Sequence, residues 1–208
     1  VDPATLPATP GIALTQLENR HRLPARVRNS HKGLFGHVGI IGGSSGMVGA
    51  CLIAGRAALQ QGAGSVTLGA LDERIVVDYL DPRLMFAPPE TLANARLDGL
   101  AIGPGLGRSP RARALLEAAL AAPCPLVLDA DALNLLASDP ELASLAVRRS
   151  PSTLLTPHPG EAARLLGSSN AEIQADRIGA ALRLSAQFHA HVALKGAGTV
   201  IAHPDGRY

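Results

Sequence analysis

Short apolar segments without polar alternation recur along the chain from His37 onward. Helical stretches separate most of them, and continuous apolar runs of this length are typical of parallel strands that are covered on both faces. The pattern therefore predicts an α/β protein with a layered fold, a mostly parallel central sheet and helices on both faces. The predicted strands lie at 37–42, 65–70, 97–103, 125–130, 152–157 and 191–196.

Three longer stretches show the apolar spacing of amphipathic helices. The first, 47–61, places Met47 and Cys51 on one stripe with two alanines and has glycines after it that can end a helix. The second, 111–121, is stopped by Pro123, and the third covers 171–189. No period repeats along the chain, so these elements are expected to form one domain.

Residues 1–30 differ in composition from the rest. They are rich in Pro, Arg and Thr and contain one short helical pattern at 13–20. We expect this segment to be a lead-in that packs on the edge of the domain formed by residues 31–208. A length of 208 residues, of which 47% are apolar, fits one such core.

Composition excludes several classes of function. A net charge of +2 without a charge run, together with 2% aromatic residues, argues against a nucleic-acid partner, and small-molecule ligands are favoured. No apolar run is long enough to span a membrane and no signal peptide is recognised, so a cytoplasmic protein is expected. Cys51 and Cys124 lack metal-binding spacing and are expected to be core thiols.

Two glycine-rich loops follow predicted strands. Gly42 to Gly46 (GGSSG) precede a helix, so free backbone N–H groups there could face an anion, although a loop that only packs helix on strand is an equal alternative. Gly103, Gly105 and Gly107 (GPGLG) allow close approach of a ligand to the backbone. In open parallel sheets such loops converge beyond the carboxyl ends of the strands, where ligands bind.

Polar side chains follow the next two strands. Asp129, Asp131 and Asn134 could orient a metal-bound phosphate through water or hold a hydroxyl; for Asp131 a helix-capping role is favoured, whereas the role of Asp129 is left open. In TPHPGE, Glu161 lies in the first turn of a helix, where a carboxylate usually matches the dipole. His158 stands between two prolines, and there a substrate-facing role is favoured.

The segment KGAGT, residues 195–199, follows the last strand listed above and is predicted to lead into a further strand and a turn before Tyr208. Its lysine, threonine and backbone donors suit phosphates, and a plain hairpin turn is the alternative. His31 and Lys32 precede the first strand and could close the pocket, although a surface role is nearly as well supported.

Taken in order, HKGLFGHVGIIGGSSGMVGA, GPGLG, DADALN, TPHPGE and KGAGT resemble the ADP/ATP-dependent NAD(P)H-hydrate dehydratases, the carbohydrate-kinase-related family of the ribokinase-like fold. The resemblance runs from His31 to Tyr208. It implies a hydro-lyase for nicotinamide cofactor repair, which dehydrates hydrated NADH or NADPH (S epimer) by phosphorylation of the ring hydroxyl and loss of phosphate. ADP or ATP would be the co-substrate and Mg²⁺ the cofactor. A homo-oligomer, by family analogy a tetramer, is expected.

The resemblance also implies roles for single residues. Ala50, a glycine of GPGLG (Gly105 or Gly107) and His158 would contact the hydrated dinucleotide. Glu161 matches the position through which such enzymes organise Mg²⁺ by way of water. The nucleotide phosphates would be held by Lys195, Gly196, Ala197, Gly198 and Thr199. Leu34 replaces a residue that is frequently acidic or polar in the family.

A GxGD segment, which in this family follows KGAGT and supplies the catalytic aspartate, is expected to lie beyond Tyr208. The printed chain alone is therefore expected to bind poorly and to turn over negligibly. Two alternative functions stay open. One is a small-molecule kinase of the same fold, acting on a sugar, hydroxymethylpyrimidine or hydroxyethylthiazole, and the other is a non-catalytic nucleotide-binding subunit.

Overall fold

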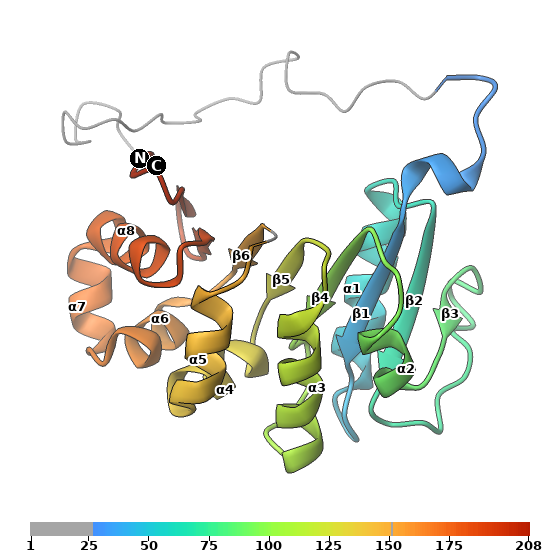
Figure 1. The fold of residues 1–208 in the computed structure, drawn as a ribbon, viewed down its shortest axis with the longest axis horizontal. Coiled ribbons are helices and arrows are strands. Elements are labelled where there is room, and N and C mark those ends of the chain that lie inside the picture. Colours follow the sequence, from blue (N-terminus) through green and yellow to red (C-terminus); the bar gives the residue numbers. More distant parts are fainter. Residues whose placement is uncertain (1–26, 151) are drawn as a thin grey trace.

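The computed structural model describes residues 27–150 and 152–208. An eight-stranded sheet with the order β3-β2-β1-β4-β5-β6-β7-β8 runs through it, and every neighbouring pair is parallel except β7 and β8 (Figure 1). All the predicted strands are present. The strands are β1 His37–Gly42, β2 Ser65–Ala70, β3 Met85–Phe86, β4 Gly99–Ile102, β5 Leu126–Leu128, β6 Thr153–Leu155, β7 His191–Leu194 and β8 Val200–Ala202.

Helices lie on both faces of the sheet, as predicted, but not equally. Helix α1 packs on β1 and β2 from one face, and the α-helices that follow it in the chain are gathered on the opposite face (Figure 1). The predicted helical pattern at 13–20 lies outside the described residues. The helices are η3 Lys32–Phe35, α1 Val48–Gln60, α2 Pro89–Ala93, α3 Pro110–Ala121, α4 Asp131–Ser138, α5 Pro140–Val147, α6 Pro159–Leu166, α7 Asn170–Ala175 and α8 Arg177–Phe188.

The two faces of the sheet support two cores of different size. Under α1, Ile40 of β1 packs with Cys51 and Leu68 in a small cluster. The large cluster lies on the opposite face and takes Ile41 from the same strand, since successive side chains of a strand point to opposite faces. Both cysteines are buried and free, as expected for core thiols, and burial raises the pKa of Cys51 to about 12.

The helix predicted over 171–189 is divided into α7 and α8, so this prediction is wrong in its continuity. Asp176 leaves the helical region, with φ −140° and ψ 77°, and its carboxylate accepts a hydrogen bond from the N–H of Gly179 at 2.8 Å. The apolar spacing continues across the break because both helices bury one face against the same core. The side chain of Asp176 starts the second helix, and apolar periodicity does not record such a cap.

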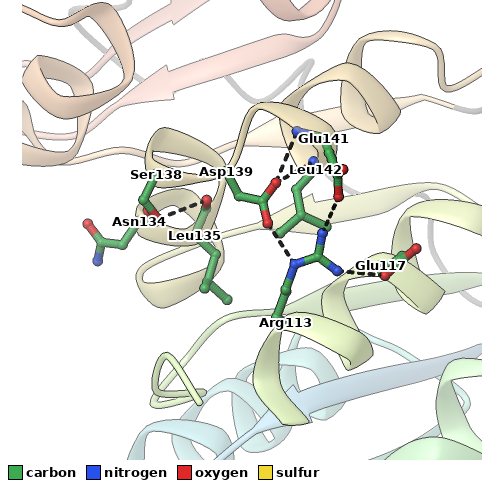
Figure 2. A network of polar contacts seen from close by, with 8 residues as sticks. All are labelled: Arg113, Glu117, Asn134, Leu135, Ser138, Asp139, Glu141 and Leu142. Atoms are coloured by element: carbon green, nitrogen blue, oxygen red, sulfur yellow. Dashed lines mark hydrogen bonds and ion pairs between the residues drawn. The ribbon is translucent and has the colours of Figure 1, made fainter. Parts of the chain in front are cut away.

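A single arginine ties α3 to the start of α5 (Figure 2). Arg113 donates to Asp139 at 2.7 Å, to Glu141 at 2.7 Å and, within its own helix, to Glu117 at 2.9 Å. Asp139 also caps α5, because one of its carboxylate oxygens accepts from the N–H groups of Glu141 and Leu142. These contacts fix α3 and α5, which cover the middle of the sheet, relative to each other.

No helix among the described residues is long and apolar enough to cross a membrane.

Candidate functional site

The predicted ligand loops lie in one row along the sheet. They follow the carboxyl ends of β1, β4, β5, β6 and β7, which are consecutive neighbours in the strand order. The carboxyl ends of parallel strands meet at one edge, so segments far apart in the sequence become adjacent there. The loops are 43–47, 103–109, 129–130, 156–158 and 195–199.

The first two loops bind each other through their backbones. The N–H of Gly43 donates to the carbonyl of Pro104 at 2.9 Å, and the N–H of Ser44 donates to the carbonyl of Gly105 at 2.6 Å. A Cβ on Gly42 would lie 2.1 Å from the Pro104 carbonyl oxygen. The expectation of free anion-binding N–H groups is therefore wrong for Gly43 and Ser44. Here the glycines allow two backbones to approach each other.

Asp131 connects GPGLG to the next strand and does not cap a helix. The cap position of α4 is Ala130, at φ 48°, and the Asp131 carboxylate accepts a hydrogen bond from the N–H of Gly107 at 2.9 Å. The capping role predicted for Asp131 is thus wrong. Because the chain turns sharply at Ala130, Asp131 becomes the first residue of the helix and its side chain is left to hold the neighbouring loop.

Asp129 joins the ends of three strands. It follows β5, and its Oδ1 accepts hydrogen bonds from the Thr156 hydroxyl at 2.8 Å, after β6, and from Lys195 Nζ at 2.7 Å, after β7. The N–H of Lys195 donates to the carbonyl of Pro157 at 2.8 Å. Both ionic side chains stay partly open, with exposed fractions of 44% for Lys195 and 30% for Asp129. The role that the sequence left open for Asp129 is to orient the lysine of KGAGT.

His158 and Glu161 form a capping box at the start of α6. Nδ1 of His158 accepts hydrogen bonds from the N–H groups of Gly160 and Glu161 at 3.0 and 3.2 Å, and the Glu161 carboxylate accepts from the N–H of His158 at 2.8 Å. With Nδ1 as acceptor, the neutral imidazole carries its proton on Nε2. The His158 side chain is half exposed whereas Glu161 is buried, so the histidine can also face a ligand.

Asn134 does not reach this row. Its side chain is buried and accepts a hydrogen bond from Nε of Arg164 at 2.7 Å, which links α4 to α6. The suggested phosphate or hydroxyl contact is therefore replaced by a helix-to-helix contact. One helical turn beyond Asp131, the chain already runs away from the strand ends.

Ala50 lies beyond the carboxyl end of β1, whereas His31 and Lys32 lie before its amino end. Ala50 is exposed in the first turn of α1, and its N–H donates to the carbonyl of Met47. A Cβ on Gly105 would lie 2.6 Å from the same carbonyl oxygen, so Ala50 is close to the GPGLG loop. Lys32 lies in η3, before β1, and a Cβ on Gly64 at the start of β2 would meet its carbonyl oxygen. Closure of the pocket by these two residues is thus wrong, because they lie at the amino end of the sheet.

Sequence reasoning missed Arg177, the first residue of α8. Its guanidinium donates to the carbonyls of Ala197 at 2.7 Å and of Leu194 and Lys195 at 3.2 Å each, all in or beside KGAGT. The sequence carried no signal for it, because the predicted helix over 171–189 placed Arg177 in a helix interior, and only the break at Asp176 makes it the first residue of α8.

A cavity of about 230 Å³ lies outside the row, at the carboxyl ends of β2 and β3. It contains none of the predicted site residues. Its lining is mostly apolar and consists of Ala70, Glu73, Ile75, Val76, Phe86, Ala87 and Pro88.

The fold and this row of loops define an α/β protein whose predicted ligand-binding loops lie along the carboxyl edge of a parallel sheet. Residues 38–208 match the family model described as NAD(P)H-hydrate dehydratase, and the chain belongs to that family. The resemblance that the five sequence motifs carry is thereby confirmed.

Two relatives and one solved structure show the extent of the similarity. The ADP-dependent (S)-NAD(P)H-hydrate dehydratase of Neisseria meningitidis is 41% identical over 92% of this chain, and the bifunctional NAD(P)H-hydrate repair enzyme Nnr of Moorella thermoacetica is 42% identical over 93%. The crystal structure of the ADP/ATP-dependent NAD(P)H-hydrate dehydratase from Bacillus subtilis, co-crystallised with ATP and Mg²⁺, matches 88% of this chain with 34% identity and a TM-score of 0.72. The chain spans 66%, 39% and 66% of these three proteins, respectively.

Proposed function

We propose that the protein to which this chain belongs dehydrates hydrated NADH or NADPH, the S epimer, with ADP or ATP as phosphoryl donor. The observation that carries the proposal is the Asp129–Lys195 pair beside the KGAGT loop, in a chain of the NAD(P)H-hydrate dehydratase family. An oriented cation and open backbone donors suit a transferring phosphoryl group, where the protein supplies position and charge stabilisation.

The proposed reaction has two steps. The ring hydroxyl takes the terminal phosphoryl group of the nucleotide and loses its proton, because hydroxide is a poor leaving group. The lone pair of the ring nitrogen then expels inorganic phosphate, and the neighbouring ring carbon loses a proton to restore the reduced nicotinamide. In this scheme Lys195 and the N–H groups of residues 196–199 hold the nucleotide phosphates.

The hydrated dinucleotide is assigned to the other end of the row. Ala50, Gly105 and Gly107 lie around the first two loops, and His158 presents a half-exposed imidazole next to the Asp129 group. The dinucleotide would thus extend from the loops after β1 and β4 to His158 after β6, the strand next to β7, and a direct transfer between the two ligands requires such proximity. The single contacts of these residues with substrate belong to the proposal.

Mg²⁺ would enter this site with the nucleotide rather than occupy a protein cage. No group of three or more His, Cys, Asp or Glu side chains that could hold a metal is found among the described residues. Glu161 is buried and its carboxylate already accepts from the N–H of His158, so its role for Mg²⁺ is limited to one exercised through water. Such an arrangement fits a cation that keeps several waters and binds phosphate oxygens, whose charge it neutralises.

The test uses the full-length protein with hydrated NADH, ADP or ATP, and Mg²⁺. We expect a nucleotide-dependent rise in absorbance at the reduced-nicotinamide band, with release of inorganic phosphate in equal amount. A stable phosphorylated alcohol without recovery of the cofactor would instead indicate a kinase. Absence of any nucleotide-dependent change would contradict both enzyme assignments. The expected homo-oligomer is part of the same proposal and is tested by the solution mass of that protein.

A further inference from the structure

Arg177 approaches the KGAGT loop from the side of its carbonyl groups. One guanidinium nitrogen donates to Ala197 O at 2.7 Å, and the other donates to Leu194 O and Lys195 O at 3.2 Å each. The planar fork of a guanidinium suits this task, because its donors point in fixed directions toward several acceptors. Three carbonyls of one short segment are therefore turned toward one side chain.

The direction of these carbonyls fixes the direction of the neighbouring amides. A trans peptide holds the C=O of one residue and the N–H of the next on opposite sides, and no cis peptide occurs among the described residues. Since the carbonyls of Lys195 and Ala197 face Arg177, the N–H groups of Gly196 and Gly198 face away from it. Neither N–H group donates to an acceptor within the described ranges 27–150 and 152–208.

Gly196 lets the guanidinium lie directly against the backbone. A Cβ at this position would meet Nη2 of Arg177 at 2.5 Å and its Cζ at 2.9 Å. Gly198, at φ 72°, adopts the left-handed conformation that glycine tolerates without strain. The two glycines of the motif thus serve different ends, since one makes room for Arg177 and the other turns the chain.

The position of Arg177 is unfavourable for the stability of α8 itself. It is the first residue of the helix, where the dipole presents its positive end, and its Nε is buried without a hydrogen-bond partner among the described residues. An arginine at the first position of α8 therefore does not serve to stabilise the start of that helix. Local rules are broken in this way mainly where a site requires it.

We propose that Arg177 is a positioning residue for adenine-nucleotide binding. It holds the carbonyls of the KGAGT loop on one side, so that the N–H groups of Gly196 and Gly198 are already presented to the nucleotide phosphates before binding. Successive amides presented in this manner form an anion-binding concavity. The inference rests on the proposed function, because it takes the phosphates of ADP or ATP as the ligand of this loop.

The test measures ADP affinity of the full-length protein with Mg²⁺ by calorimetry, for wild type and Arg177→Met. We expect the Kd for ADP to rise about 10- to 100-fold, the range seen when an outer group that orients a ligand-binding group is removed. The KM for hydrated NADH should change less than about twofold, because the carbonyls that Arg177 binds belong to residues 194–197 and not to the loops after β1 and β4. A merely structural role of Arg177 would not separate the two ligands.

Arg183→Met is the matched control, since Arg183 lies on the same helix and forms a surface ion pair with Asp176 at 3.7 Å. Its Kd for ADP should equal that of wild type. If Arg177→Met does not fold, Arg177→Lys answers the question, because a lysine keeps the charge but not the fork, and we expect its Kd for ADP to rise about tenfold. A folded Arg177 variant with wild-type ADP affinity, or equal weakening of both ligands, overturns the inference. A wild-type protein that binds no ADP overturns the proposed function, which distinguishes the two failures.

Discussion

Two glycine-rich loops follow the carboxyl ends of parallel strands, GGSSG after β1 and KGAGT after β7. They differ in which backbone groups, N–H or C=O, are hydrogen-bonded within the protein. In the first loop, the N–H groups of Gly43 and Ser44 donate hydrogen bonds to carbonyls of the adjacent GPGLG loop. In the second loop, the carbonyls of Lys195 and Ala197 accept hydrogen bonds from Arg177, and the N–H groups of Gly196 and Gly198 donate to no acceptor among the described residues. The two loops are alike in glycine content and in their place in the fold, but the neighbouring loop binds the first two N–H groups of GGSSG, whereas the arginine binds carbonyls of KGAGT.

The difference shows that glycine content alone does not identify a phosphate-binding loop. Glycine permits close approach, and the approaching group can be another backbone, a side chain or a ligand. Which of the three applies is decided by where each N–H and C=O finds its partner. For the N–H groups of Gly43 and Ser44 the partner is a neighbouring loop, and for the carbonyls of Lys195 and Ala197 it is Arg177.

The largest effect is expected from Lys195→Met in KGAGT. The variant removes the cation beside the proposed phosphate site and leaves Asp129 without its ion pair. We expect kcat/KM for ADP-dependent dehydration to fall about 10²- to 10³-fold, as when one preorganised charge-stabilising donor is lost. Steady-state kinetics of the full-length protein measure it. Lys32→Met, at the amino end of the sheet, should keep wild-type kinetics, and a fall of less than about threefold for Lys195→Met would remove the lysine from the site.

Gly42→Ala is expected to act on stability instead. Its Cβ would lie 2.1 Å from the carbonyl oxygen of Pro104, in the contact between the first two loops. Overpacking against backbone costs about 3 kcal/mol of unfolding free energy, because neither loop can move without losing its hydrogen bonds. Urea unfolding measures the loss. Wild-type stability of the variant would show that the two loops are less tightly joined than the hydrogen bonds of Gly43 and Ser44 indicate.

Gly196→Ala tests the other loop with the same chemical change. The added methyl group would displace the guanidinium of Arg177, so we expect the Kd for ADP to rise about tenfold. Gly206→Ala is its control, since Gly206 also has a positive φ, of 86°, but nothing lies within 4 Å of its Cβ. That control should lose about 1 kcal/mol of stability and no ADP affinity. Equal ADP affinities of the two variants would contradict the contact with Arg177.

The smallest effect concerns pH and the surroundings of GGSSG. Arg74 lowers the pKa of Asp72 from its ordinary value of 3.8 to about 2, and the N–H of Asp72 donates to the carbonyl of Gly43. A depressed folded-state pKa stabilises the protein above the ordinary value, and this contribution is lost as pH falls toward 2. Urea unfolding midpoints of Arg74→Met and wild type should therefore differ slightly at pH 6 and converge near pH 2. A difference that is constant over this range would rule out the ion pair as its cause.

The sequence by itself determined the sheet and the position of the site along it. Apolar runs such as 37–42 and 191–196 are strands because no polar residue interrupts them, and the motifs behind them fall at one edge because parallel strands end together. The tertiary structure decided what each polar group binds. Asp131 reaches Gly107, Asp129 reaches Lys195 and Arg177 reaches Ala197, over separations of 24, 66 and 20 residues. Hydrogen bonds depend on distance in space, which local spacing in the sequence does not contain, and so the roles of these three residues appeared only when the strands were set side by side.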